Sequence, residues 1–389
     1  MKNWTVLVYV ASDNNLIIEN IFDLIEMKKV GTTDNLNLIV QCDFGGETNY
    51  PFKFTSGQKD EPLLKDIDSR RRAKLKTLQG AMGVQAQTGE PPMQRKLSET
   101  IKEFINTTLA EYESKHYMLV LSGHGSGTVG DFLSADNSGD PYTRDNLSIP
   151  ELKALLEDIT KQDDGKKLKK RKFDILALDS CLMSMAEIGY ELRDVAQYLV
   201  GAQGFEPLSG WPYANILKEF DTTSNDIESL VKKIVEKYID YYRDYTLGGL
   251  SVDYSAANLS YSVILANAIT NLAKSLKSGL DSEQEKDDAK KSLILSHWEA
   301  QAYKFEQYVD LYDFCELLMR NNPKYEAKCG KVLAAIRKYI VKSCYSGPAV
   351  QYSHGVSIYF PWNKGALLDP KSNPYNDLEF NKKTKWMGF

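Results

Sequence analysis

The sequence predicts an α/β protein whose central sheet is mainly parallel and is covered by helices on both faces. Short apolar runs alternate with segments of helical apolar spacing through residues 1–260. This alternation favours parallel pairing, because each helix crosses back over the sheet between two strands. The first run, residues 4–11, is also almost continuously apolar, which is typical of a strand buried on both faces.

Strands and helices are expected to alternate along this part of the chain. The strands are expected at residues 4–11, 36–42, 116–122, 173–179, 198–202 and 250–254. The helices are expected at residues 16–29, 97–112, 149–159, 182–196, 211–220 and 227–242, the first of them after the turn and cap residues 12–15. Residues 45–92 are polar and irregular, so we expect an excursion or hairpin there and assign it no function.

The pattern changes after residue 260, which divides the chain into two regions. Residues 261–342 have an almost wholly helical pattern, and one more strand is expected at 355–360. A chain of 389 residues also exceeds the size at which one hydrophobic core normally keeps growing. We therefore predict a domain at 1–260 and a helical region at 261–389, whose final strand returns to an edge of a sheet.

Composition excludes several classes of protein. The chain has 48 Lys and Arg against 53 Asp and Glu, a net charge of −5, so it lacks the basic footprint of a nucleic-acid-binding protein. No apolar run approaches the roughly 20 residues of a membrane span, and the first apolar run is too short for a signal segment. The five cysteines are widely spaced without a C-x-x-C pair, which argues against a zinc knuckle or a dense disulfide framework.

Two predicted strands end in residues that carry chemistry. The strand at 116–122 runs into Ser-Gly-His-Gly-Ser-Gly, which places His124 among glycines, and the strand at 173–179 runs into Asp179-Ser-Cys181. Both ends lie on the edge of the sheet where α/β proteins place their ligands. Cys181 is expected at the start of the helix at 182–196, where the macrodipole would lower the thiol pKa.

Each of these residues also has a plain structural interpretation. A lone cysteine after a buried strand is often a small core residue, and a lone histidine in a loop is often merely exposed. Asp179, just before a predicted helix, could act as an N-cap. His116, His297 and His354 have weaker contexts, at the start of a strand, within a helical run and before a strand.

Several segments resemble the clostripain-like cysteine peptidases. They are Ser-Gly-His-Gly-Ser-Gly at 122–127, Asp-Ser-Cys-Leu-Met-Ser-Met at 179–185, Glu-Pro-Leu-Ser-Gly-Trp-Pro-Tyr at 206–213, and the chain ends at 6–14 and 355–361. The resemblance implies a caspase-like α/β/α sandwich, with residues 1–260 as the peptidase domain, and a bacterial protein that is secreted, periplasmic or on the cell surface. The family commonly has a second acidic residue where this chain has Gln203, so the outer substrate pocket is expected to differ.

The candidate residues fit peptide-bond cleavage. The Cys181 thiolate would attack the scissile carbonyl, and His124 would protonate the departing amine. The backbone N–H groups of Gly125 and Cys181 are the expected oxyanion donors. Asp179 is close enough to the nucleophile to select Arg or Lys, as the resemblance also implies, and Glu206 is the next candidate for this role.

The prediction is therefore a cysteine endopeptidase that acts on proteins or peptides with basic residues. The alternative is a catalytically silent binding protein of the same fold, which recognises basic peptides through Asp179 without cutting them.

Two weaker signals complete the analysis. Residues 136–140, Asp-Asn-Ser-Gly-Asp, could bind Ca²⁺, but Leu147 occupies the twelfth position where an EF-hand has Glu, so a polar turn is favoured and no cofactor is expected to be required. Self-cleavage between His124 and Cys181 could activate the protein. Arg144 is the first candidate for it, although Asp145 could slow the cut, and the basic run 166–172, which ends at Lys172, is the second.

Overall fold

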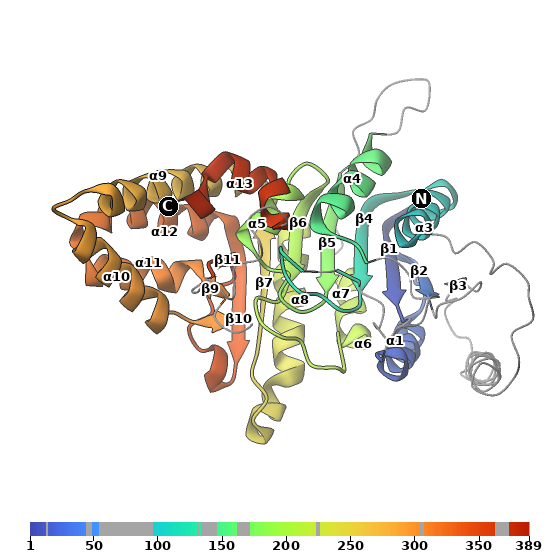
Figure 1. The fold of residues 1–389 in the computed structure, drawn as a ribbon. Helices are drawn as coiled ribbons and strands as arrows, with labels where there is room; N and C mark the ends of the chain where they lie inside the picture. Colours follow the sequence, from blue (N-terminus) through green and yellow to red (C-terminus); the bar gives the residue numbers. More distant parts are fainter. Residues whose placement is uncertain are drawn as a thin grey trace, which may run out of the picture.

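The computed structural model describes residues 1–12, 15–43, 49–53, 96–130, 132–133, 146–161, 172–222, 226–303, 307–361 and 373–388 (Figure 1). Its strands are β1 (Lys2–Ala11), β2 (Leu36–Asp43), β3 (Asn49–Lys53), β4 (Ser114–Ser122), β5 (Phe173–Asp179), β6 (Ala196–Gly201), β7 (Val252–Asn258), β8 (Ala302–Tyr303), β9 (Tyr308–Asp310), β10 (Ile340–Ser346) and β11 (Ser357–Tyr359). Its α-helices are α1 (Ile17–Val30), α3 (Leu97–Glu111), α4 (Ile149–Thr160), α5 (Ala186–Glu191), α6 (Tyr213–Leu217), α7 (Glu219–Thr222), α8 (Ile227–Tyr242), α9 (Ser262–Asp281), α10 (Lys286–Glu299), α11 (Leu311–Asn321), α12 (Glu326–Tyr339) and α13 (Glu379–Thr384).

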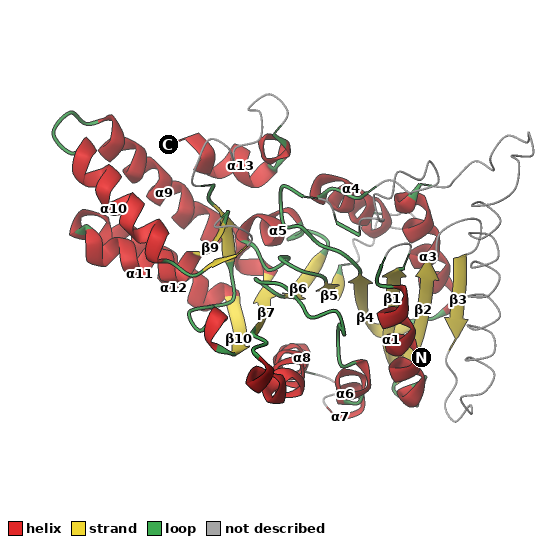
Figure 2. Cartoon of the chain, turned by 60° about the horizontal axis from the view of Figure 1, so that its bottom comes forward, coloured by secondary structure: helices red, strands yellow, loops and turns green. Residues whose placement is uncertain are grey.

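The main sheet has the order β10-β7-β6-β5-β4-β1-β2-β3, and its centre, from β6 to β2, is parallel. Strands β3, β7 and β10 pair antiparallel at the two sides. Helices α3, α4 and α5 cover one face, while α1, α6 and α8 cover the other (Figure 2). The predicted mainly parallel α/β sheet is confirmed, and β3 forms the predicted hairpin with β2.

The alternation of side chains along β1 explains why this strand is apolar throughout. Leu7 and Tyr9 belong to the core under α3 and α4, whereas Val6 and Val8 belong to the core under α1 and α8. Every one of these side chains is fully buried. A central strand covered on both faces has no solvent side on which polar residues would be favoured.

The region after residue 260 holds more strand than the sequence predicts. Helices α9 to α12 form a lobe beside β7 and β10 (Figure 1), and β11-β9-β8 form a small antiparallel sheet next to it. The final strand does lie at the edge of a sheet, the small one, while β10 completes the main sheet. The almost wholly helical pattern predicted for 261–342 is therefore wrong at β8, β9 and the start of β10, and the division at residue 260 stays a prediction.

The helix predicted at 182–196 is much shorter in the structure. Only α5 (Ala186–Glu191) is helical, because the preceding backbone bonds to other segments. Leu182 N–H donates to the Gly204 carbonyl at 2.9 Å and Ser184 N–H donates to the Ala202 carbonyl at 2.8 Å. Leu182 also has a left-handed φ of 65°. The expectation that Cys181 begins a helix is therefore wrong.

A buried carboxyl ties α5 to the end of the chain. Glu187 is fully buried and accepts hydrogen bonds from the Tyr359 N–H and the Tyr375 hydroxyl, both at 2.8 Å. Burial raises the pKa of Glu187 to about 7, although these two donors oppose the rise.

Among the described helices, none is long and apolar enough to cross a bilayer.

Candidate active site

The register between β4 and β5 brings the two predicted chemical residues to one place. Ser122 pairs with Asp179 in parallel, so His124 and Cys181 each lie two residues beyond a paired position. Two hydrogen bonds join the loops at once: the Gly123 N–H donates to the Asp179 carbonyl at 3.2 Å, and the Ser180 hydroxyl donates to the Gly123 carbonyl at 2.7 Å. The histidine and the cysteine therefore share the carboxyl edge of the sheet.

Gly125 sets how closely these two loops approach. A Cβ atom added at this glycine would lie 2.5 Å from the Cys181 carbonyl oxygen and 3.0 Å from the Ser180 Cβ. The loop is also held from its other side, where the Leu133 N–H donates to the His124 carbonyl at 2.7 Å. Any side chain at position 125 would push the histidine loop away from the cysteine loop.

The thiol of Cys181 is half-buried and contacts the loop that follows β6. The Glu206 N–H donates to its Sγ at 3.2 Å. Burial raises the pKa of the Cys181 thiol, the Glu206 N–H opposes this rise, and the Asp179 carboxyl adds to it. The expectation of a thiol pKa lowered by a helix terminus is therefore wrong, because no helix begins at this residue, and activation requires a base.

His124 is half-buried, and its Nε2 lies 2.7 Å from the Oδ1 of Asn15, in the connection between β1 and α1. The other three histidines have partners far from this edge or within the C-terminal region. His116 contacts the Asp174 carboxyl, and His297 contacts the Phe360 carbonyl. His354 contacts the Asp310 carboxyl. Among the histidines, His124 is therefore the candidate for a base beside Cys181.

Asp179 and Glu206 form a pair of carboxyls beside the thiol. Asp179 is buried and accepts a hydrogen bond from the Tyr213 hydroxyl at 2.7 Å. The carboxyl of Glu206 hydrogen-bonds to that of Asp179, and its Oε1 is buried without a hydrogen-bond partner in the described structure. Burial raises the pKa of both carboxyls, and for Glu206 the Asp179 charge raises it further. Asp179 does not cap α5, whose N-cap is Met185.

A third carboxyl, Asp23 on α1, was missed by sequence reasoning. Asp23 is buried, and a Cβ on Gly210 would lie 3.5 Å from its Oδ2 and 3.8 Å from the Asp179 Oδ1. Burial and then the Asp179 charge raise the pKa of Asp23. Asp23 directly precedes the buried Leu24, but Glu19, Asn20 and Glu26 lie one turn away on the same helix, so the local pattern did not mark it. Asp23 and Asp179 therefore both approach Gly210.

Aromatic rings close the far side of this acidic cluster, which we define as Asp23, Asp179 and Glu206. The Tyr242 hydroxyl donates to the Gly210 carbonyl at 2.5 Å, and the Trp211 Nε1–H donates to the Tyr254 hydroxyl at 2.5 Å. Tyr238 and Tyr254 stack with ring centroids 4.1 Å apart. The rings exclude water from behind the carboxyls, so charge there is costly until a cation arrives.

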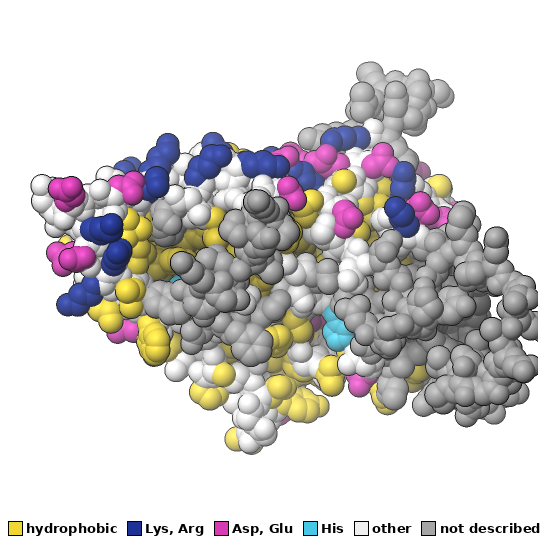
Figure 3. All heavy atoms as spheres, viewed as in Figure 1, with side chains coloured by type: hydrophobic (Ala, Val, Ile, Leu, Met, Phe, Trp, Pro, Cys, Tyr) yellow, Lys and Arg dark blue, Asp and Glu magenta, His cyan; other side chains and the backbone are white. Residues whose placement is uncertain are grey.

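Gln203, the departure from the family pattern, has a structural role. Its Nε2 donates to the Asp310 Oδ2 at 2.9 Å, its Oε1 accepts from the Gly355 N–H at 2.6 Å, and its own N–H donates to the Asp253 Oδ1 at 2.7 Å. The side chain therefore joins the Glu206 loop to the C-terminal region. The exposed side chains of Phe205 and Leu208 flank Glu206. In the view of Figure 3, the charged side chains of the described residues gather mainly along the upper and left margins of the molecule.

The remaining sequence candidates lie elsewhere. Lys172 is at the start of β5, opposite the catalytic edge, and its Nζ donates to the Arg193 carbonyl at 2.7 Å. Arg144, residues 166–171 and the calcium candidate at 136–140 lie outside the described residues. Within the described ranges, no group of three His, Cys, Asp or Glu side chains could hold a metal ion.

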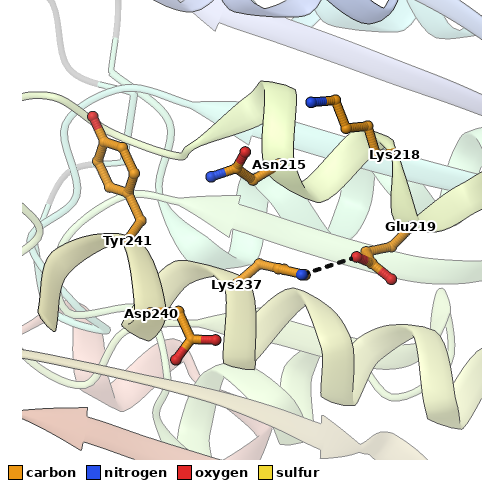
Figure 4. Close-up of a pocket in the computed structure, with 6 residues that line it drawn as sticks. All are labelled: Asn215, Lys218, Glu219, Lys237, Asp240 and Tyr241. Carbon is orange, nitrogen blue, oxygen red and sulfur yellow. Dashed lines mark ion pairs between the residues drawn. The ribbon is translucent and has the colours of Figure 1, made fainter.

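A cavity of about 300 Å³ lies away from the site, between α8 and the short helices α6 and α7 (Figure 4). An ion pair of 3.2 Å between Lys237 and Glu219 crosses it. Its other lining residues are Asn215, Lys218, Asp240 and Tyr241. None of the predicted site residues lines this cavity.

A parallel sheet between two helical layers, with a cysteine and a histidine at adjacent strand ends, defines a cysteine protease of caspase-like fold. The comparisons agree with this class. The model of the clostripain family matches residues 8–389, so the chain belongs to the clostripain family. Clostripain from Hathewaya histolytica is 24% identical over 414 residues, which cover 92% of this chain and 74% of that protein.

Two solved structures have the same fold along their whole length. An inactive zymogen C11 protease from Parabacteroides distasonis is 21% identical, with a TM-score of 0.67 and 99% of each chain covered. A secreted C11 cysteine protease from Bacteroides thetaiotaomicron, solved with an irreversible peptide inhibitor, is 19% identical, with a TM-score of 0.67 and 100% of each chain covered. The chain is thus a cysteine protease of the clostripain family with a caspase-like fold.

The close approach at Gly125 can be tested by Gly125→Ala. The added Cβ would lie 2.5 Å from the Cys181 carbonyl, so the loops must separate, and a displacement of this kind costs on the order of 100-fold in kcat. Gly330→Ala on α12 is the control, because nothing lies within 4 Å of a Cβ there. Peptidase assays with matched melting curves decide, and a Gly125→Ala enzyme as active as the control would contradict the geometry.

Proposed function

We propose that this protein is an endopeptidase that cleaves proteins and peptides after Arg or Lys through Cys181 and His124. One observation carries the specificity: the acidic cluster is buried directly beside the nucleophile. The Glu206 residue that contributes a carboxyl to the cluster also donates its N–H to the Cys181 Sγ at 3.2 Å. A side chain that enters the cluster therefore brings its own carbonyl carbon close to the thiol.

The acidic cluster is suited to a cation because no cationic side chain of the described residues is among the strongest influences on its three carboxyls. Among the described residues, the neighbours that act on Asp23, Asp179 and Glu206 are carboxyl, hydroxyl and thiol groups. A guanidinium offers a fork of N–H donors that can bond two carboxyl oxygens at once, including the unpartnered Glu206 Oε1. The resemblance to clostripain-like peptidases implies the same basic preference.

The reaction follows the usual chemistry of a thiol nucleophile. His124 takes the proton from the thiol while the sulfur bonds to the scissile carbonyl carbon, and the carbonyl electrons move onto oxygen. The N–H groups of Gly125 and Cys181 would stabilise this oxyanion. His124 then gives the proton to the departing amine, the C–N bond breaks, and water hydrolyses the acyl-enzyme by the same route.

Removal of either member of the dyad is expected to abolish turnover. Cys181→Ala should leave no measurable peptidase activity, and His124→Ala should reduce kcat by roughly 100- to 10,000-fold, the usual effect of general acid–base catalysis. Cys344→Ala is the matched control, since Cys344 is also a half-buried free thiol but lies on β10. Near-wild-type hydrolysis of an Arg reporter by either dyad variant would remove the assignment.

Replacement of a carboxyl in the acidic cluster by a neutral amide is expected to lower activity without lowering the melting temperature. Burial raises the carboxyl pKa values, so the stability these groups contribute is complete at low pH and is lost as the pH rises through them. Asp179→Asn should therefore melt no lower than wild type at pH 8, yet lose roughly 100-fold or more in kcat/KM for Arg and Lys reporters.

The control for this experiment is Asp174→Asn, which changes a carboxyl at the opposite end of β5, where Asp174 contacts His116. This variant should keep the basic preference of the wild type. If Asp179→Asn melts at a lower temperature and retains its preference for Arg and Lys, the carboxyl is structural and Glu206→Gln should be tested for the specificity role.

Self-cleavage at Arg144, or second at the 166–172 run, is proposed as the activating step. The sites lie between His124 and Cys181, and one structural relative is an inactive zymogen. Incubated wild-type protein should yield a fragment that begins at Asp145 or within 167–173, whereas Cys181→Ala should remain a single chain. N-terminal sequencing decides, and a fully active wild-type enzyme that stays intact would show that these loops regulate nothing.

One labelling experiment separates the protease from a silent binding protein of the same fold. An irreversible thiol alkylator with a basic side chain for the acidic cluster should label Cys181 in an enzyme that also turns over the reporter. A silent binder would bind the basic peptide without turnover.

We also propose export from a bacterial cell, because the family resemblance implies it and a structural relative is a secreted protease. Calcium binding at 136–140 stays a prediction.

A further inference from the structure

We propose that Asn15 is a positioning residue for His124, which holds the imidazole with its proton on Nε2 and leaves Nδ1 to exchange the proton with Cys181. The inference rests on the proposed Cys181 and His124 dyad and adds a third residue that orients the base. The sequence alone marks Asn15 only as one of the turn and cap residues 12–15 before the first helix.

Parallel pairing of neighbouring strands places Asn15 at the same edge of the sheet as His124 and Cys181. Strand β1 lies beside β4, with Val10 paired to Ser122, so the connection after β1 and the histidine loop leave the sheet at one edge. That connection is anchored below the surface: the Ser12 N–H donates to the Asp43 carbonyl at 2.8 Å, and the Asn20 Nδ2 donates to the Ser12 hydroxyl at 2.9 Å. Both Ser12 and Asn20 are buried.

The side chain of Asn15 does not serve the helix that follows it. The N-cap of α1 is Leu16, whose side chain makes no capping hydrogen bond. The Asn15 Oδ1 instead lies 2.7 Å from the His124 Nε2. The contact that the structure shows for the Asn15 side chain is therefore the one to the proposed base, His124.

The chemistry of the two groups fixes the tautomer. An amide Oδ1 has lone pairs and no hydrogen, so the imidazole must donate and Nε2 must carry the proton. In the attack step Nδ1 then accepts the thiol proton as the S–C bond forms, and in the next step Nδ1–H returns it to the amine as the C–N bond breaks. The Nε2–H bond to Asn15 is kept throughout. A third group that orients the base is the general logic of catalytic triads.

Nuclear magnetic resonance tests the tautomer without any substrate. The chain has four histidines, so ¹⁵N-histidine labelling gives few signals, and His124→Ala identifies the one of interest. In the neutral form His124 should show the Nε2–H tautomer, and Asn15→Ala should shift it toward a mixture of both tautomers. A wild-type His124 in the Nδ1–H tautomer, or a spectrum unchanged by Asn15→Ala, overturns the proposal even if the enzyme is active.

Kinetics supply the second readout. Asn15→Ala should lower kcat by about 10- to 100-fold with KM within about twofold of wild type, because orientation of the base acts on the chemical step. Asn15→Asp keeps the acceptor oxygen and should restore kcat to within about threefold. Asn35→Ala also removes an Oδ1 acceptor, here the partner of the Asn3 Nδ2 just before β2, and should leave kcat unchanged.

The outcomes distinguish this inference from the proposed function. If wild-type protein fails to hydrolyse any Arg or Lys reporter, the proposed function fails while the tautomer experiment still decides the role of Asn15. If wild type is active and Asn15→Ala matches Asn35→Ala in kcat, or if Asn15→Asp fails to restore activity in a folded protein, the positioning role is wrong.

Discussion

The parallel pairing of β4 with β5 is the constraint on which the candidate site depends. With Ser122 opposite Asp179, the two loops leave the sheet in step, and hydrogen bonds between Gly123, Asp179 and Ser180 hold them there. A slip of one residue would turn every side chain of one strand to the other face of the sheet. The two cores packed against opposite faces prevent such a slip, so packing far from the chemistry determines the distance between the two loops.

Desolvation of the carboxyls in the acidic cluster costs free energy of folding. The acidic cluster of Asp23, Asp179 and Glu206 has aromatic rings behind it, and burial raises the pKa of each of the three carboxyls. Hydrophobic residues of similar size would pack there at lower cost. A functional site often retains such destabilising groups, because binding of the right ligand offsets their desolvation. The same burial raises the pKa of the Cys181 thiol, so it disfavours the charged forms of the nucleophile and of its pocket alike.

Local patterns allowed most of the fold to be predicted, and they placed the two candidate dyad residues at one edge of the sheet, where the structure has them. Apolar runs marked the central strands, since strands such as β1 have cores on both faces, and strand ends marked His124 and Cys181. The errors arose where distant segments override local preference. Residues 182–185 have a helical pattern but bond to Ala202 and Gly204, and β9 is defined by its partner β11. Asp23 and Asn15 were missed because their roles depend on neighbours that are remote in sequence.

Gln203 links the substrate side of the sheet to the C-terminal region through both ends of one amide. Its Nε2 bonds to Asp310, its Oε1 bonds to the Gly355 N–H, and the same backbone continues to Glu206. An acid at this position would face the carboxyl of Asp310 instead of donating to it, and the two charges would repel in a buried place. Exchange of residue 203 for an acid would therefore require a compensating change at residue 310. We expect the two positions to vary together among relatives, because one amide joins the substrate side of the sheet to the C-terminal region.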